Sequence, residues 1–252
     1  MASKQHLYSL LDFIIERLQG YDVMVTAQAA SEGLTRFANS EINQNVYEDK
    51  TTLHIVVGDG KRRTKAVTSA IDRPDLESIL QSVVANLNAL PEQGQQIVLV
   101  DSPREIVVDH FDEALSRRFD IEQRPREIKD CLEGVADPSF QGSGPLSHVE
   151  HQMAVANSKG IRRYYRGNSV TFTALASRSG IGPGSTRITS AASDGLDCRA
   201  AMRRAYEKAV MNQEPADMKT GRYTVILEPL ALGDLLPFVA AIGFSGRSIQ
   251  DG

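Results

Sequence analysis

The stretch that decides the fold is Thr35-Arg36-Phe37-Ala38-Asn39-Ser40-Glu41-Ile42-Asn43-Gln44-Asn45, which predicts two strands joined by a tight turn. Asn39 and Ser40 favour a turn, because their short polar side chains hydrogen-bond to nearby backbone groups. Arg36 and Gln44 are polar positions that can pair across such a hairpin. We interpret the stretch first as a structural hairpin. The alternative is an exposed strand that accepts an extended peptide through main-chain hydrogen bonds.

Outward from this hairpin, residues 1–92 show helical and strand patterns in turn. Apolar residues at helical spacing from Leu7 to Leu18 predict a first helix, and a second is expected from Asp72 to Leu87, before Pro91. Between them lie strand patterns near 23–25 and at 42–47, 51–57 and 63–68, separated by turn signals at 31–33, 48–50 and 58–60. Such short connections favour an antiparallel meander. The sequence therefore predicts an N-terminal α+β domain in which a helix pair covers one face of an antiparallel sheet.

The middle of the chain, residues 93–220, predicts a second α+β domain. Residues 91–110 have the character of a linker, and a helix is expected at about 120–135. A long β-hairpin follows, with strands at 148–156 and 161–176 joined by Asn157-Ser158-Lys159-Gly160. A further strand near 186–191 and a helix that contains Cys198 complete this region.

The last segment, residues 221–252, predicts the beginning of an incomplete C-terminal domain. It contains a strand pattern at 223–227 and an apolar, helical stretch at 230–242. The chain stops soon after this apolar stretch, which something should cover. We therefore expect the sequence to be a truncated piece of a longer protein.

Composition and charge argue against several classes of protein. The net charge of -4 gives no electrostatic reason to bind nucleic acid or an anionic membrane. Two cysteines, Cys131 and Cys198, are too few for a disulfide framework or a cysteine zinc site, so we expect buried, reduced thiols. No stretch approaches the ~18 apolar residues of a membrane span, and Met1 to His6 lack the layout of a signal peptide. We expect a cytoplasmic protein.

A search for catalytic groups finds one suggestive motif, His148-Val149-Glu150-His151. Zinc peptidases of the zincin type need two histidines four residues apart on a helix, whereas this pair is three apart in a strand pattern. On a strand, His148 and His151 point to opposite faces. The chain also lacks a Gly-x-Ser-x-Gly elbow and a phosphate-binding loop. The residues by themselves therefore predict no catalytic residue, no cofactor-binding residue and no metal ligand.

The stretch from Thr35 to Asn45 resembles the signature hairpin of the TldD/PmbA family, once called modulators of DNA gyrase and known to be metallopeptidase-related. Further stretches agree with the family in order and spacing: Val155-Ala156-Asn157-Ser158-Lys159-Gly160, Thr224-Val225-Ile226-Leu227-Glu228-Pro229 and Gly243-Phe244-Ser245-Gly246. The resemblance covers the whole chain, but only about the first half of a typical member.

The resemblance implies the PmbA (TldE-like) type of chain. TldD-type members carry a His-Glu-x-x-x-His helix and a later Cys, which bind the metal that activates water for peptide hydrolysis. The corresponding stretch here is Leu235-Leu236-Pro237-Phe238-Val239-Ala240-Ala241-Ile242-Gly243, which contains no His, Glu, Asp or Cys. Such side chains cannot hold a divalent metal, so the family's catalytic residues carry over to no position of this chain.

The function that the resemblance implies is that of a non-metal-binding subunit of a TldD-type metallopeptidase. Zinc is then expected only in a TldD-like partner, and the substrates are unfolded or leader peptides. We expect no catalysis by this chain alone. Two alternatives stay open: a homodimeric PmbA-like peptide-binding protein without proteolysis, and a regulator linked to DNA gyrase. The acidic charge balance argues against direct contact with DNA.

Overall fold

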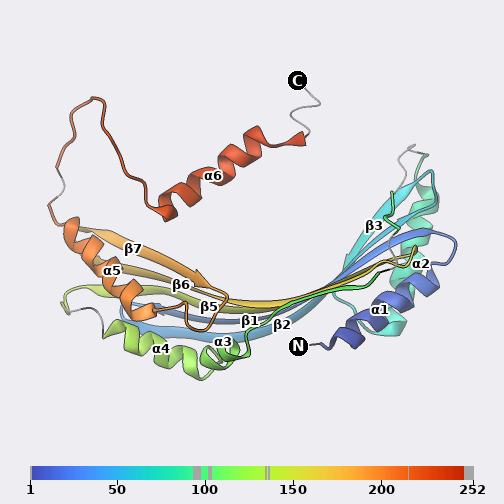
Figure 1. Ribbon diagram of the computed structural model, residues 1–252, viewed down its shortest axis with the longest axis horizontal. Helices are drawn as coiled ribbons and strands as arrows, with labels where there is room; N and C mark the ends of the chain where they lie inside the picture. Colours follow the sequence, from blue (N-terminus) through green and yellow to red (C-terminus); the bar gives the residue numbers. More distant parts are fainter. Residues whose placement is uncertain are drawn as a thin grey trace.

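The computed structural model describes residues 2–92, 98–101, 104–133, 135, 137–214 and 216–246. It is an α+β fold, as the sequence predicts, with one large sheet and helices at both of its ends (Figure 1). The strands are β1 (Asp22–Ala38), β2 (Glu41–Gly58), β3 (Arg63–Thr68), β4 (Ile106–His110), β5 (Gln141–Asn157), β6 (Arg162–Arg178) and β7 (Ile181–Ser190). The helices are α1 (Lys4–Arg17), α2 (Arg73–Ala89), α3 (Glu113–Arg118), α4 (Gln123–Leu132), α5 (Cys198–Met211) and α6 (Pro229–Gly243).

The sheet has seven strands in the order β3-β2-β1-β5-β6-β4, and β7 also pairs with β6. The described pairings are antiparallel, except that β4 runs parallel to β6. The predicted long hairpin is confirmed as β5 and β6, although β5 begins at Gln141, seven residues before the predicted start at His148. Its turn contains Gly160 at a φ of 88°. β4 and β7 lie along the same edge of β6, β4 beside Arg163–Gly167 and β7 beside Val170–Arg178.

One face of the sheet is covered and the other is open. Along β1, every second residue from Val23 to Phe37 is buried, which is the period expected when one side of a strand faces a core. Helices α1 and α2 cover this face at one end of the sheet, and α4 and α5 cover it at the other (Figure 1). We call the opposite, solvent-facing side the open face.

Helix α1 follows directly from its sequence pattern. Leu7, Leu11 and Ile14 are fully buried against the sheet, and each such side chain contributes roughly 1.5–3 kcal/mol. The backbone N–H of His6 donates to Ser3 Oγ over 3.1 Å, which caps the first turn. Helix α2 begins after Asp72, with a proline in its first turn, as the sequence predicts.

The predicted turns at 31–33 and 48–50 are wrong, because β1 and β2 each run unbroken through these positions. The polar residues there lie within the long strands. The backbone at Gly33 is approached closely by Arg124, whose Nη1 would lie 2.2 Å from an added Cβ. Gly33 is therefore a packing position, and Gly within a strand often marks such a close approach.

Two other expectations are corrected. The predicted linker at 91–110 contains β4 at its end. Every residue of β4 is exposed, so the strand has no alternation of buried and exposed residues. The predicted strand at 223–227 forms no strand and is exposed. The apolar helix expected at 230–242 is confirmed as α6.

The hydrophobic core consists of two clusters on the covered face. The first packs α1 and α2 on the sheet, and the second packs α3, α4 and α5 with the ends of β1, β5 and β6. The long central strands run through both clusters. The division of the chain at 92/93 and 220/221 stays a prediction. Residues 247–252, where the chain ends, lie outside the described residues.

Within the described ranges, none of the helices is long and apolar enough to cross a lipid bilayer.

Candidate functional site

The hairpin between β1 and β2 has a strained two-residue turn, in agreement with the predicted turn. Asn39 and Ser40 both have positive φ angles, 54° and 60°. Positive φ at both central residues is the mark of a type I′ hairpin turn. The N–H of Ser40 donates to the carbonyl of Gly142 over 2.9 Å, and the N–H of Gly142 donates to Ser40 Oγ over 3.0 Å. Arg36 and Gln44 are register partners, as expected.

A buried arginine contacts this hairpin on the covered face of the sheet. Arg124 of α4 has no exposed surface, and its guanidinium donates four hydrogen bonds to neutral oxygens. The acceptors are Thr35 Oγ1 at 3.1 Å, Phe119 O at 3.1 Å, Asn45 Oδ1 at 3.2 Å and Val46 O at 3.1 Å. Burial lowers the pKa of the guanidinium, and the nearby Asp120 carboxylate partly offsets this. The hairpin's polar residues thus have a structural role here.

A second polar cluster lies on the covered face around His148, which is 4% exposed. Its Nε2 is 3.4 Å from Ser116 Oγ and 3.8 Å from a carboxylate oxygen of Glu150. Asn168 Nδ2 donates to Ser116 Oγ over 2.7 Å. In a Ser-His-acid triad the acid contacts the other ring nitrogen, whereas here Ser116 and Glu150 approach the same one. The cluster therefore satisfies buried polar groups and lacks the geometry of a nucleophilic triad.

His148 and His151 point to opposite faces of the sheet, as the strand pattern predicts. The His151 ring lies on the open face and stacks on Tyr165 at 5.1 Å, and the His110 ring is 6.1 Å from Tyr165. Both histidines are register partners of Gly167, which lies between them on β6. A Cβ on Gly167 would lie 2.5 Å from Tyr165 Oη, so the missing side chain leaves room for the tyrosine.

The open face offers a broad, mixed surface. Exposed apolar side chains on it are Met24, Val46, Val67 and Met153. They lie among polar side chains such as Gln28 and Glu32. Such a surface suits contact with an extended chain or another protein, because it combines apolar contact with hydrogen-bonding groups.

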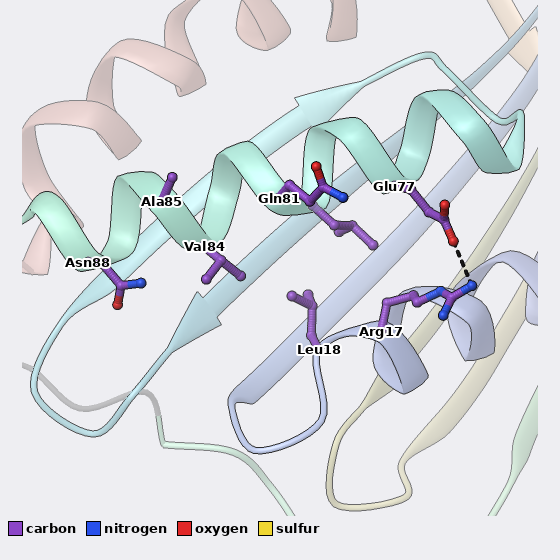
Figure 2. A pocket seen from close by; sticks show the side chains of 8 residues that line it. Arg17, Leu18, Glu77, Gln81, Val84, Ala85 and Asn88 are labelled. Carbon is purple, nitrogen blue, oxygen red and sulfur yellow. Dashed lines mark ion pairs between the residues drawn. The ribbon is translucent and has the colours of Figure 1, made fainter.

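A groove of about 670 Å³ lies between α1 and α2 (Figure 2). Arg17 and Glu77 form an ion pair across it, with 2.6 Å between Nη2 and a carboxylate oxygen. Gln81, Val84 and Asn88 continue its wall along α2. Both charged residues are about half exposed, so the groove resembles a solvated helix contact more than a catalytic site.

Comparison with known proteins assigns this arrangement to a fold. The sequence matches no protein-family model and no curated protein. A proposed modulator of DNA gyrase from Bacteroides thetaiotaomicron matches with a TM-score of 0.78 and 14% identity, over 95% of this chain and 56% of that one. A proposed modulator of a DNA gyrase from Thermotoga maritima matches with a TM-score of 0.64 and 17% identity, over 81% and 47%. TldE from Thermococcus kodakarensis matches with a TM-score of 0.63 and 12% identity, over 81% and 47%.

The chain has a TldE-like fold. The resemblance that the hairpin sequence indicates is thereby confirmed at the level of the fold. The chain spans about half the length of each of these solved structures.

In this TldE-like fold, the stretch Leu235–Gly243 forms the greater part of α6. No residue of α6 is buried, and Figure 1 shows the helix standing apart from the sheet. Glu228 links the start of α6 to α5 through ion pairs with Arg204, at 3.2 Å, and Lys208. The rest of α6 presents apolar side chains such as Phe238 to solvent.

The TldE-like fold also brings together residues that the sequence does not connect. Cys131 and Cys198 are both buried and free, as expected, but their sulfur atoms lie close together. Glu127 joins them, and the three candidate ligand atoms lie within 4.8 Å of one another. Glu127 and Cys131 are one helical turn apart, which the sequence shows, but nothing in the sequence places Cys198 beside them.

Proposed function

We propose that this chain is a PmbA (TldE)-like subunit of a TldD-type metallopeptidase that processes extended peptides, and that it does not bind the catalytic metal. The observation that carries the proposal is the helix α6. In the family resemblance its Leu235–Gly243 stretch corresponds to the helix that binds the catalytic metal, yet it offers only hydrocarbon side chains. Metal-assisted hydrolysis needs ligands with lone pairs to hold the ion, so catalysis would belong to a partner.

The exposed surface of α6 supports a role in assembly. Leu235, Phe238 and Ile242 are each more than half exposed. Burying such apolar side chains against a second chain is favourable at about 25 cal/mol per Å² of apolar surface. A TldD-like partner, forming a heterodimer, is the occupant that we propose.

Peptide binding is supported by the free edge of β2. Among the described residues, β3 pairs only with Leu53–Gly58, so the outer side of β2 before Leu53 has no strand neighbour. An extended peptide adds to such an edge by main-chain hydrogen bonds, with pockets for alternate side chains. Near Asn45 and Val46, Arg124 already occupies backbone and side-chain acceptors, so the segment from Tyr47 to Thr52 is the part available.

The decisive experiment is co-purification followed by a peptidase assay. A tagged copy of the chain, expressed in its native cells, should co-purify with a second chain that bears His-Glu-x-x-x-His. The pair should hydrolyse an unfolded peptide, and removal of zinc with a chelator should abolish the activity. The chain purified alone should be inactive. Hydrolysis by this chain alone, or its recovery from cells only as a monomer, would contradict the proposal.

A homodimer without proteolysis is a second candidate, since the apolar surface of α6 also suits self-association. Sedimentation of the purified chain in the presence and absence of the TldD-like partner separates the two arrangements.

A cytoplasmic location is part of the proposal, and the two free cysteines are consistent with a reducing compartment. The link to DNA gyrase rests on the names of two structural relatives.

A further inference from the structure

Three side chains from two helices converge in the second core cluster. Glu127 and Cys131 lie one turn apart on α4, and Cys198 is the first residue of α5. One ligand atom from each lies within 4.8 Å of the other two. Both cysteines are 1% exposed, whereas the Glu127 side chain is 24% exposed.

Hydrophobic packing alone does not require two thiols and a carboxylate at these positions. A small hydrophobic residue would fill the position of either thiol, and a carboxylate beside two buried sulfurs carries a desolvation cost. Hydrogen bonding to Cys131, followed by burial, strongly raises the pKa of the Cys198 thiol, and Glu127 adds to this effect. The Cys198 thiol is therefore protonated at neutral pH in the absence of a metal ion.

We propose that Glu127, Cys131 and Cys198 bind a zinc ion that ties α4 to α5. Two thiolates and a carboxylate are a donor set that zinc accepts, with water as the fourth ligand. On binding, the ion displaces the two thiol protons, which pass to water. The site belongs to this chain and is independent of the proposed partnership.

Charge balance supports the assignment. Two thiolates and one carboxylate carry three negative charges, and zinc supplies two positive charges. Arg118, whose Nη2 is 3.2 Å from a Glu127 carboxylate oxygen, supplies the last positive charge. Arg118 and Glu127 are also the partly exposed members of the group, so they mark the side from which the ion and its water enter.

The test is a titration of the reduced, chelator-treated chain with cobalt(II) and then zinc. Cobalt should bind with a stoichiometry of one, produce thiolate-to-metal charge-transfer absorption in the near ultraviolet, and be displaced by zinc. Two protons should be released per ion in weakly buffered solution. Because protons compete for the thiolates, zinc affinity should fall as the pH is lowered.

Variants assign the ligands. Cys131→Ser and Cys198→Ser should each weaken zinc binding by more than about 100-fold, beyond the loss of an outer-shell partner. Glu127→Gln, which spares both thiols and the core, should weaken it by at least about 10-fold. Asp130→Asn, an exposed neighbour on the same helix, is the matched control and should leave the affinity unchanged. Absence of thiolate–cobalt absorption in the folded, reduced chain, or equal affinity in Glu127→Gln and Asp130→Asn, would overturn the proposal.

Discussion

At the scale of single residues, the contact between Gly33 and Arg124 explains why a glycine lies in the middle of a long strand. An added Cβ would lie 2.2 Å from Arg124 Nη1. A flexible side chain normally moves away from such a clash. Here four hydrogen bonds and complete burial hold the guanidinium in place. Moving it would leave buried oxygens without donors, at roughly 1–3 kcal/mol each.

Gly33→Ala should therefore lower the free energy of unfolding by about 1–3 kcal/mol, the usual cost of overpacking. Urea unfolding of the purified chain measures this change. The control is the same substitution in an Arg124→Met background, where the clash is absent and the additional cost should largely vanish. Equal costs in the two backgrounds would show that Arg124 is not the residue that limits the space at Gly33.

His148 gives the protein a pH dependence on the acid side. Burial lowers its pKa in the folded state below the ordinary value of about 6.5, although Glu150 partly opposes the shift. Unfolded chains then bind more protons than folded ones, so stability is present above about pH 6.5 and is lost as the pH falls toward the folded pKa.

Comparing denaturation at pH 7.5 with that at pH 5.5, His148→Gln should show a smaller loss of stability than the wild type, because it removes this proton uptake. Gln28→Ala, on the open face, is the control, because it removes no titratable group, and it should retain the wild-type loss of stability between the two pH values. An unchanged slope in His148→Gln would mean that other groups cause the acid sensitivity.

At the scale of elements, the hairpin turn combines a strained backbone with a useful side chain. Ser40 has a φ of 60°, which glycine adopts freely and other L-residues only at a cost. Its hydroxyl compensates by accepting from the N–H of Gly142. Ser40→Ala and Ser40→Gly both lose this bond, but only alanine keeps the strain. Ser40→Gly should therefore be more stable than Ser40→Ala by about 1 kcal/mol, as thermal unfolding can measure. The opposite order would show that the turn relaxes to negative φ.

Sequence patterns predict some of these elements and not others. Helix α1 and strands β5 and β6 could be predicted because their apolar periodicity reports directly on the core. The continuity of β1 could not be predicted, because Ser31 and Gly33 suit a turn as well as a strand. The contact that explains Gly33 is made by Arg124, which also hydrogen-bonds to Thr35, 89 residues earlier in the chain. Likewise, β4 has no buried residue, so no alternation marks it.

Across the molecule, the sequence predicts the parts of the candidate sites that depend on local geometry and not those that depend on tertiary contacts. The separation of His148 from His151 follows from the two-residue period of a strand, and it was predictable. The meeting of Glu127, Cys131 and Cys198 depends on how α4 and α5 pack, which is a tertiary contact without a local signal. Long-range convergence of this kind is the information that a single sequence lacks.

The apolar surface of α6 makes a prediction about assembly that is separable from stability. Because no residue of α6 is buried, Leu235→Glu with Phe238→Glu should leave the unfolding midpoint of the isolated chain unchanged. The same pair of substitutions should abolish co-purification with the proposed TldD-like partner, since Phe238 is 70% exposed and charged side chains at an apolar interface are costly to desolvate. Val98→Glu, outside α6 and 90% exposed, is the matched control and should retain the partner. Retained co-purification in the α6 variant would place the interface elsewhere, whereas a lowered midpoint would show that α6 packs on the chain itself.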